Sequence, residues 1–145
     1  AGEKPWGRVK ADVYMPCATQ NEIGLEDAKR MIEEGTSKLL IEVANMPTKA
    51  EAVEELQKAG FMIAPSKAVN AGGVAVSALE MSQNAMKLSW TEEEVDEKLK
   101  KIMKNIFNNI DSAAKKYGMD GNLIAGANIA GFLKVAEAML NEGIF

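Results

Sequence analysis

The chain has 145 residues, of which 47% are hydrophobic and 26% are charged, a composition typical of one globular domain with a sizeable core. Its net charge of -4 argues against nucleic-acid binding, which usually shows a basic stripe. The sequence contains no histidine, which excludes Ser-His-Asp and Cys-His catalysis. Its single cysteine, Cys17, cannot form an internal disulfide and leaves no transition-metal cluster.

Membrane insertion and export are not expected from the sequence. It has no uninterrupted apolar run of the roughly 18 residues that a transmembrane helix needs. Residues 2–7 are polar and lack the apolar region of a signal peptide. With a single cysteine, we expect a cytoplasmic protein without a membrane span, and we expect Cys17 to be a small buried residue rather than a nucleophile.

The first half of the chain alternates short apolar runs with helical patterns, which indicates parallel α/β units. The predicted strands are Ala11–Met15, Leu39–Val43 and Phe61–Ala64. A helix is predicted at Leu25–Glu34, ended by Gly35, and a second helix runs to Ala59. For the second helix, Thr48 and Glu51 fit a capping box.

The second half of the chain is predicted to be helical. From Gly72 to about Met86 the pattern favours a largely buried helix, with Ala75, Val76 and Leu79 facing inward. Thr91 and Glu94 fit another capping box, from which helical spacing continues to Tyr117. Residues 118–122 form the predicted turn, and residues 127–140 the predicted last helix.

This order of elements predicts an α/β fold: the second half of a Rossmann-like doubly wound parallel sheet, with about three strands, followed by long C-terminal helices. The G-x-G-x-x-G fingerprint is absent, because no two glycines are separated by a single residue. We assign residues 1–86 to a partial nucleotide-binding domain and residues 87–145 to a C-terminal helical segment packing on it.

Paired glycines make Asn70–Asn84 the most informative segment for function. Gly72 and Gly73 allow the backbone to approach a ligand, and Asn70 and Ser77 place an amide and a hydroxyl nearby. Free N–H groups at a helix start there would suit an anionic or amide-bearing small molecule. A glycine-rich turn that simply enters a core helix is the alternative.

Several motifs occur along the chain in an order that closely resembles the C-terminal part of the hexameric bacterial-type glutamate dehydrogenases. They are Pro16–Glu22, Glu42–Thr48, Pro65–Val74, Ser77–Asn84, Leu88–Thr91 and Ala125–Phe132. The resemblance covers essentially the whole chain. It implies an enzyme that oxidatively deaminates L-glutamate to 2-oxoglutarate and ammonia, with hydride transfer to NAD or NADP.

The resemblance also implies roles for individual residues. Ala18 and Thr19 match the strand-end loop against which the cofactor lies, and Asn45 matches an asparagine beside the nicotinamide ribose. Asn70 matches a residue near both the nicotinamide amide and the α-carboxylate of the substrate. The glutamate side-chain pocket is matched by two further residues, Val74 and Ser77.

Each of these roles has a structural alternative. Ser77 could be tolerated packing in a helix of small residues, and Asn45 could set the turn into the following helix. The resemblance places the catalytic lysine and aspartate in a missing N-terminal part, so we expect the isolated fragment to be inactive. It also implies a homo-oligomer, typically a hexamer. A non-enzymatic α/β interaction module is the alternative function.

Overall fold

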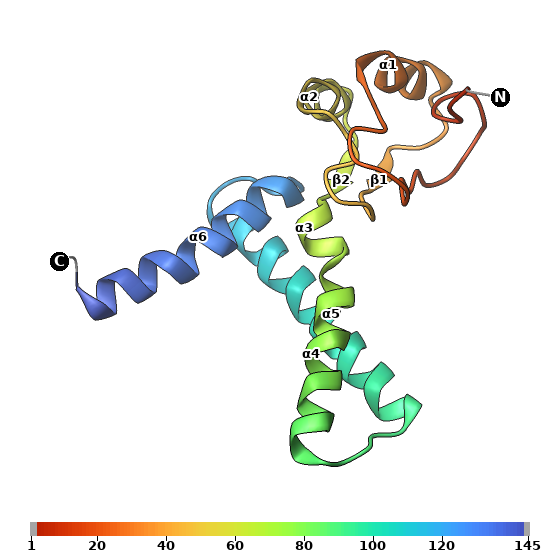
Figure 1. The fold of residues 1–145 in the computed structure, drawn as a ribbon. Helices are drawn as coiled ribbons and strands as arrows, with labels where there is room; N and C mark the ends of the chain where they lie inside the picture. Colours follow the sequence, from red (N-terminus) through yellow and green to blue (C-terminus); the bar gives the residue numbers. More distant parts are fainter. Residues whose placement is uncertain (1–2, 144–145) are drawn as a thin grey trace. The chain divides into compact units, whose positions relative to one another are not determined.

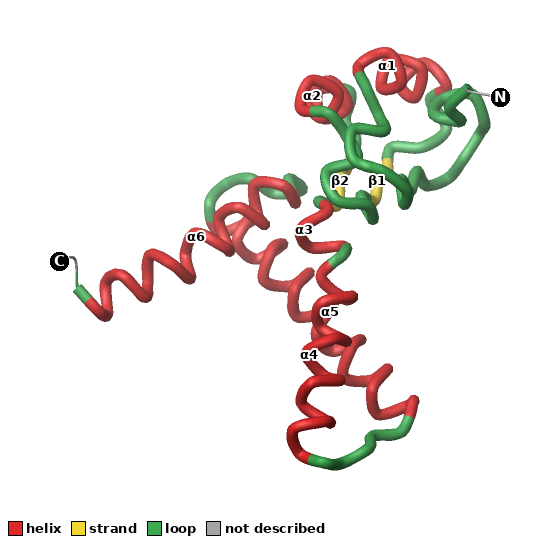
Figure 2. Tube along the Cα trace, viewed as in Figure 1, coloured by secondary structure: helices red, strands yellow, loops and turns green. Residues whose placement is uncertain are grey.

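The computed structural model describes residues 3–143, which divide into two compact units between Asn70 and Ala71 (Figure 1). The first unit contains α1 (Leu25–Glu34), β1 (Leu39–Ile41), α2 (Ala50–Lys58), β2 (Met62–Ala64) and α3 (Ser66–Val69). The second contains α4 (Ala71–Met86), α5 (Glu92–Lys116) and α6 (Leu123–Glu142). Loops make up much of the first unit, whereas the second is almost entirely helical (Figure 2).

A small parallel sheet forms the centre of the first unit. β1 and β2 pair with Leu40 opposite Ile63, and Tyr14 adds a parallel bridge to Leu40. The first predicted strand is thus reduced to one bridging residue, because Pro16 has no N–H with which to extend the ladder. The parallel sheet followed by long helices confirms the predicted fold class.

Helices α1 and α2 pack against each other on one side of this sheet (Figure 1). α1 has the predicted bounds, and Gly35 ends it in the left-handed conformation, with φ 72°. The core below the helices is made of fully buried apolar side chains. They are Ile23, Ala28, Met31, Leu40, Ala52 and Leu56.

The capping box predicted at Thr48 is wrong. α2 begins at Ala50 with Lys49 as its N-cap, and the buried Thr48 hydroxyl has no hydrogen-bond partner among residues 3–143. Thr48 instead forms a parallel bridge with Ile23, and the neighbouring Lys49 N–H donates to the Ile23 carbonyl at 3.0 Å. Because this pairing keeps the backbone extended through Thr48, the helix can start only after it.

The second unit is built on the long helix α5, which packs against both α4 and α6. The capping box predicted at its start is confirmed: the Glu94 N–H donates to Thr91 Oγ1 at 3.3 Å, and the Thr91 N–H donates to Glu94 Oε2 at 2.8 Å. α6 begins earlier than predicted, at Leu123, because the Asn122 side chain caps it by accepting from the Ala125 N–H at 3.0 Å.

The expectation that residues 72–86 would be largely buried is wrong for this chain. None of the residues of α4 is buried. Ala75 and Leu79 are half-buried, and Val76 remains 36% exposed. Among residues 3–143, α4 packs mainly on α5, so that one helix covers only one side of it. This packing also groups α4 with the C-terminal helices, whereas the sequence suggested a boundary after residue 86.

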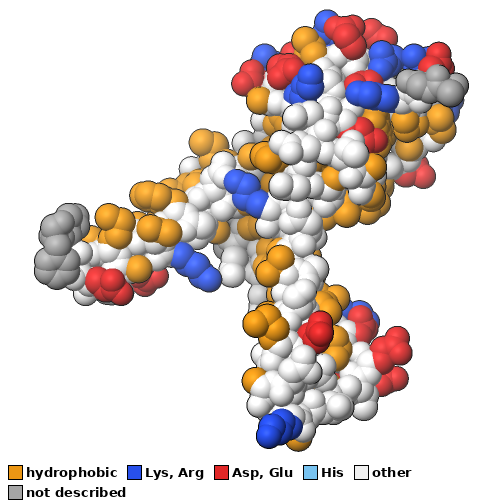
Figure 3. Space-filling model, in the orientation of Figure 1, with side chains coloured by type: hydrophobic (Ala, Val, Ile, Leu, Met, Phe, Trp, Pro, Cys, Tyr) orange, Lys and Arg blue, Asp and Glu red, His pale blue; other side chains and the backbone are white. Residues whose placement is uncertain are grey.

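Helix α6 is long and apolar, although the sequence has no uninterrupted apolar run of membrane-spanning length. Among residues 3–143, it is the one helix whose length and mean hydropathy, 1.5, would allow it to cross a membrane. Lys134 and Glu137 interrupt its apolar residues, so the helix contains no continuous apolar run of membrane-spanning length. Apolar side chains lie along the exposed part of the helix (Figure 3), including Phe132, Val135, Met139 and Leu140. The core helix of a larger protein has the same length and composition.

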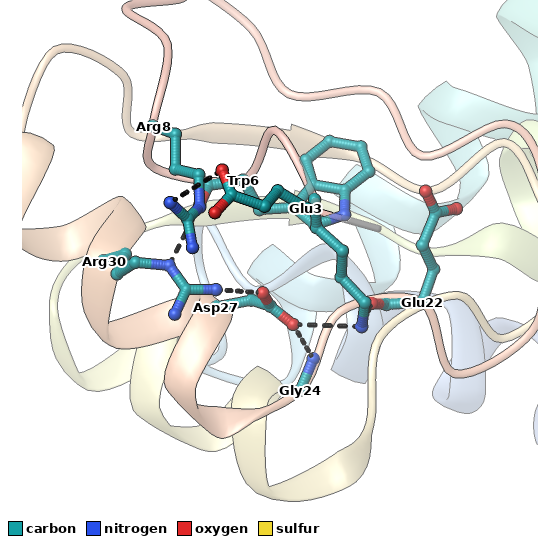
Figure 4. Close-up of polar contacts among 8 residues, drawn as sticks. Glu3, Trp6, Arg8, Glu22, Gly24, Asp27 and Arg30 are labelled. Atoms are coloured by element: carbon teal, nitrogen blue, oxygen red, sulfur yellow. Dashed lines mark hydrogen bonds and ion pairs between the residues drawn. The ribbon is translucent and has the colours of Figure 1, made fainter. Parts of the chain in front are cut away.

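Polar contacts hold the N-terminal segment on α1 (Figure 4). The buried Asp27 carboxylate accepts from the Gly24 N–H at 3.0 Å and from Lys4 Nζ at 3.3 Å, and it also pairs with Arg30. Trp6 is buried in the same segment and meets Tyr14 edge to face, with 6.4 Å between ring centroids. Burial, with a hydrogen bond to Glu34, raises the pKa of Tyr14 to about 12.

We expect Gly7→Ala to loosen this segment. Gly7 has φ +67°, and an added Cβ would lie 2.3 Å from the backbone carbon of Arg30 in α1. A left-handed alanine costs about 1–2 kcal/mol by itself, and the contact adds to that cost. Gly60→Ala is the matched control, since Gly60 has φ +82° but open space around the added Cβ. In thermal unfolding, Gly7→Ala should therefore lower Tm more than Gly60→Ala, and equal losses would contradict the contact.

Candidate functional site

The segments that follow the bridge at Tyr14, β1 and β2 meet at the carboxyl edge of the sheet. The Pro16 carbonyl, two residues beyond Tyr14, accepts from the Val43 N–H at 3.2 Å and from the Ala44 N–H at 2.9 Å. Both donors lie shortly after the end of β1 at Ile41. The Glu42 N–H, in the residue that directly follows β1, donates to the Ala64 carbonyl at the end of β2 at 3.1 Å. In parallel sheets this edge is where ligands bind.

Side chains tie the loop after β1 to the start of α3. The Glu42 carboxylate accepts from the Ser66 N–H at 3.1 Å, and Ser66 Oγ accepts from the Met46 N–H at 3.4 Å. Glu42 is 6% exposed and Ser66 is 7% exposed. A buried carboxylate is tolerated only when it is hydrogen-bonded, so these contacts organise the edge.

The four residues predicted to face a cofactor all lie in loops at this edge or at the end of α3. Ala18 and Thr19 are exposed in the loop after Pro16, and the Thr19 N–H lies 3.4 Å from Glu22 Oε2. Asn45 is exposed in the loop after β1. Asn70 is half-buried at the C-terminus of α3, where its N–H donates to the Ser66 carbonyl at 2.9 Å.

Val74 and Ser77, the two residues predicted to face only the substrate, lie in the second unit on α4. They stand three residues apart and so share a helix face. Val74 is 75% exposed, and Ser77 is exposed as well. The Ser77 hydroxyl donates to the Gly73 carbonyl of the preceding turn at 3.2 Å, which leaves its oxygen lone pairs free to accept.

Cys17 does not match its expectation. It is exposed rather than buried, and its Sγ lies 3.3 Å from the Met15 carbonyl. It stands in the loop that follows Pro16, outside the helices and strands of the first unit. Among residues 3–143, no group of three or more acidic or cysteine side chains is placed to hold a metal ion.

Glu42 and Ser66 are the residues of this edge that were not predicted individually. Both lie inside the motifs Glu42–Thr48 and Pro65–Val74, but residues this far apart in sequence give no local signal of their contact. A charged residue at the end of an apolar strand was the available clue. A carboxylate there must find a partner if the strand is buried.

A small parallel sheet covered by helices, with polar side chains at its carboxyl edge, defines a class of fold, the Rossmann-like α/β proteins. The chain belongs to a particular family in that class: the sequence model of the Glutamate/Leucine/Phenylalanine/Valine dehydrogenases matches residues 1–143.

Known proteins that resemble the chain are consistent with this membership. Over 99% of its length the chain is 56% identical to the NAD-specific glutamate dehydrogenase of Clostridium symbiosum. Over 98% of its length it is 54% identical to the NADP-specific glutamate dehydrogenase of Giardia intestinalis. The chain spans 32% of each of these relatives, about a third of their length.

Solved structures show the same agreement in fold. A glutamate dehydrogenase structure that is 56% identical superposes with a TM-score of 0.92, over 99% of this chain and 32% of that one. Plasmodium falciparum glutamate dehydrogenase 2, at 50% identity, gives a TM-score of 0.90 over 97% of this chain and 30% of that one. The backbone described above is therefore the backbone of this family.

Proposed function

We propose that the chain forms the cofactor-facing part of an NAD- or NADP-dependent glutamate dehydrogenase. The enzyme would oxidatively deaminate L-glutamate to 2-oxoglutarate and ammonia. The observation that carries the proposal is the meeting of three chain segments at one sheet edge, in a chain 56% identical to such an enzyme. When bound, the nicotinamide supplies the hydride acceptor, and the chain contributes its positioning.

The proposed cofactor-binding residues fit a nicotinamide nucleotide. Ala18, Thr19, Asn45 and Asn70 present short side chains and backbone groups that can hold a ribose and an amide without covering the reacting face of the ring. Three of them are exposed and Asn70 is half-buried, so the groups are open to a ligand.

For the substrate, we propose that Asn70 binds the α-carboxylate, Val74 lines the side-chain pocket and Ser77 binds the γ-carboxylate. A hydroxyl on an exposed helix face favours a carboxylate-tipped side chain over an aliphatic one, because hydrogen bonds to charged groups are the stronger ones. The Ser77 hydroxyl donates to the Gly73 carbonyl at 3.2 Å in this structure, and it would turn from that carbonyl to donate to the γ-carboxylate, because a carboxylate only accepts hydrogen bonds.

We expect Ser77→Ala in the complete enzyme to raise the KM for glutamate by about tenfold, since a hydrogen bond to a charged group contributes about 1.5–3 kcal/mol. Ser82→Ala is the matched control, because Ser82 is exposed on the same helix and donates in the same way to the Ala78 carbonyl, at 2.8 Å. Steady-state kinetics with glutamate varied would measure both. An unchanged KM in Ser77→Ala would remove this residue from the substrate site.

The proposal extends to the rest of the enzyme. We propose that an N-terminal part supplies the phosphate-binding loop and the catalytic lysine and aspartate, and that the enzyme is a cytoplasmic homo-oligomer that does not insert into membranes. The purified 145-residue chain should then show no glutamate-dependent reduction of NAD or NADP, whereas the complete enzyme should reduce one or both. Turnover by the chain alone would contradict the proposal that the catalytic residues lie in an N-terminal part. Inactivity of the complete enzyme would favour a non-enzymatic interaction module.

A further inference from the structure

Ser66 occupies a central place in the hydrogen bonding of the carboxyl edge. Its N–H donates to the Glu42 carboxylate at 3.1 Å, its Oγ accepts from the Met46 N–H at 3.4 Å, and its carbonyl accepts from the Asn70 N–H at 2.9 Å. One buried serine thus contacts the end of β1, the loop after β1 and the end of α3. One of these contacts is to Met46, which directly follows the proposed cofactor ligand Asn45. Another is to Asn70, which is itself a proposed cofactor ligand.

The loop after β1 needs such support. Met46 has φ 46°, a left-handed conformation that is unfavourable for a residue with a Cβ and persists only where the surroundings enforce it. Two hydrogen bonds fix its peptide groups: its N–H reaches Ser66 Oγ, and its carbonyl accepts from the Asn21 N–H at 2.9 Å. Asn45 directly precedes Met46, so its direction depends on this strained residue.

Glu42 completes the arrangement. Its carboxylate accepts from the Ser66 N–H, while its own N–H donates to the Ala64 carbonyl at the end of β2. Glu42 and Met46 are thereby tied to the same serine, one on each side of Asn45 in the sequence. These side-chain contacts add to the backbone hydrogen bonds that the loop around Asn45 makes with Pro16 and Asn21.

We infer that Ser66, whose N–H is bound by the Glu42 carboxylate, is a positioning residue. It holds the loop in the conformation that directs Asn45 toward the nicotinamide cofactor. This inference rests on the proposed function. Removing the Ser66 hydroxyl would free the Met46 N–H and allow the loop to relax from its left-handed turn. The Asn70 contact uses the Ser66 carbonyl and is kept, so the change should act on cofactor binding and spare substrate binding.

The test is Ser66→Ala in the complete enzyme, with coenzyme and glutamate varied separately. We expect the KM for the coenzyme to rise about tenfold, and the KM for glutamate to stay within about twofold. Ser66→Thr, which keeps a hydroxyl, should recover most of the affinity. Isothermal titration of the coenzyme alone gives a second measure that is independent of turnover.

Ser37→Ala is the matched control for a structural role. Ser37 is also buried, at 2% exposed, and its hydroxyl donates to the Asp12 carbonyl at 2.6 Å, on the amino side of β1. We expect Ser37→Ala to lower Tm about as much as Ser66→Ala does and to leave the coenzyme KM unchanged. Equal coenzyme KM values in Ser66→Ala and Ser37→Ala would overturn the positioning role while leaving the proposed function intact.

A second pair of variants, at Glu42, tests the inference if Ser66→Ala does not fold. Glu42→Leu and Glu42→Gln make the same comparison. Gln keeps an acceptor for the Ser66 N–H, so its coenzyme KM should stay near that of the parent, whereas Leu should raise it. Equal values in these two variants would overturn the inference. A parent enzyme that reduces neither coenzyme with glutamate would overturn the proposed function, and the inference with it.

Discussion

Gly126→Ala should destabilise the second unit by about 3 kcal/mol, at the upper end of the cost of overpacking a close contact. A Cβ at Gly126 would lie 2.3 Å from the Ile110 carbonyl oxygen and 3.1 Å from the Ala114 Cβ. The first of these is backbone of α5, which cannot move away without separating the two helices. The buried contact of α5 with α6 depends on this close approach and involves Ala113, Ala114, Leu123 and Ala127.

Gly131→Ala tests the same substitution on the same helix without the contact. Nothing lies within 4 Å of a Cβ added at Gly131. Because alanine is the better helix former by about 0.8–1 kcal/mol, this variant should be slightly more stable than the parent. Urea denaturation of the purified protein, followed by helical circular dichroism, would show opposite signs for the two variants. A Gly126→Ala protein as stable as the parent would mean that α5 and α6 do not approach this closely.

Local signals in the sequence predicted the parts of the fold whose partners are close in sequence. Gly35 ends α1 because only a few residue types accept its left-handed φ, and Thr91 begins α5 through a box closed by Glu94, three residues on. At Thr48 the same box pattern failed. There, pairing with Ile23 extends the backbone, and a contact across this distance overrides the local preference.

Burial was predicted less well than helix position. The small and apolar residues of α4 indicate a helix, and the helix is present, yet Val74 and Met81 are 75% and 71% exposed. An apolar pattern shows that a face suits burial, but it does not say which segment covers that face. The chain spans about a third of its relatives, so a pattern suited to a larger protein need not be satisfied within these residues.

For the candidate site, the sequence predicted the sheet edge at which the residues lie, but not the hydrogen bonds of Glu42 and Ser66 that hold that edge. Pro16, Val43 and Pro65 mark where the three predicted strands stop. These stops are enough to place Ala18, Thr19, Asn45 and Asn70 near one edge. The roles of these residues, and of Val74 and Ser77, stay predictions. The network of Glu42 and Ser66 could not be predicted, because it joins buried groups through side-chain directions that exist only once β1 and β2 have paired.

Asp27→Ala should lower the free energy of unfolding by about 2–3 kcal/mol, because one carboxylate caps a helix and pairs with two cations. Asp27 is 6% exposed, and its carboxylate contacts Gly24, Lys4 and Arg30 (Figure 4). Because Lys4 and Arg30 stay partly exposed to water, the loss of stability on removing the carboxylate is limited. Glu26→Ala is the matched control: its carboxylate, 74% exposed, pairs only with the exposed Lys29 among the ion pairs of residues 3–143, and such pairs contribute about 0–1 kcal/mol. Asp27→Asn, which keeps an acceptor for the Gly24 N–H, should fall between the two in urea denaturation. If Asp27→Ala and Glu26→Ala lost the same small amount, the N-terminal segment would be held by Trp6 burial rather than by these polar contacts.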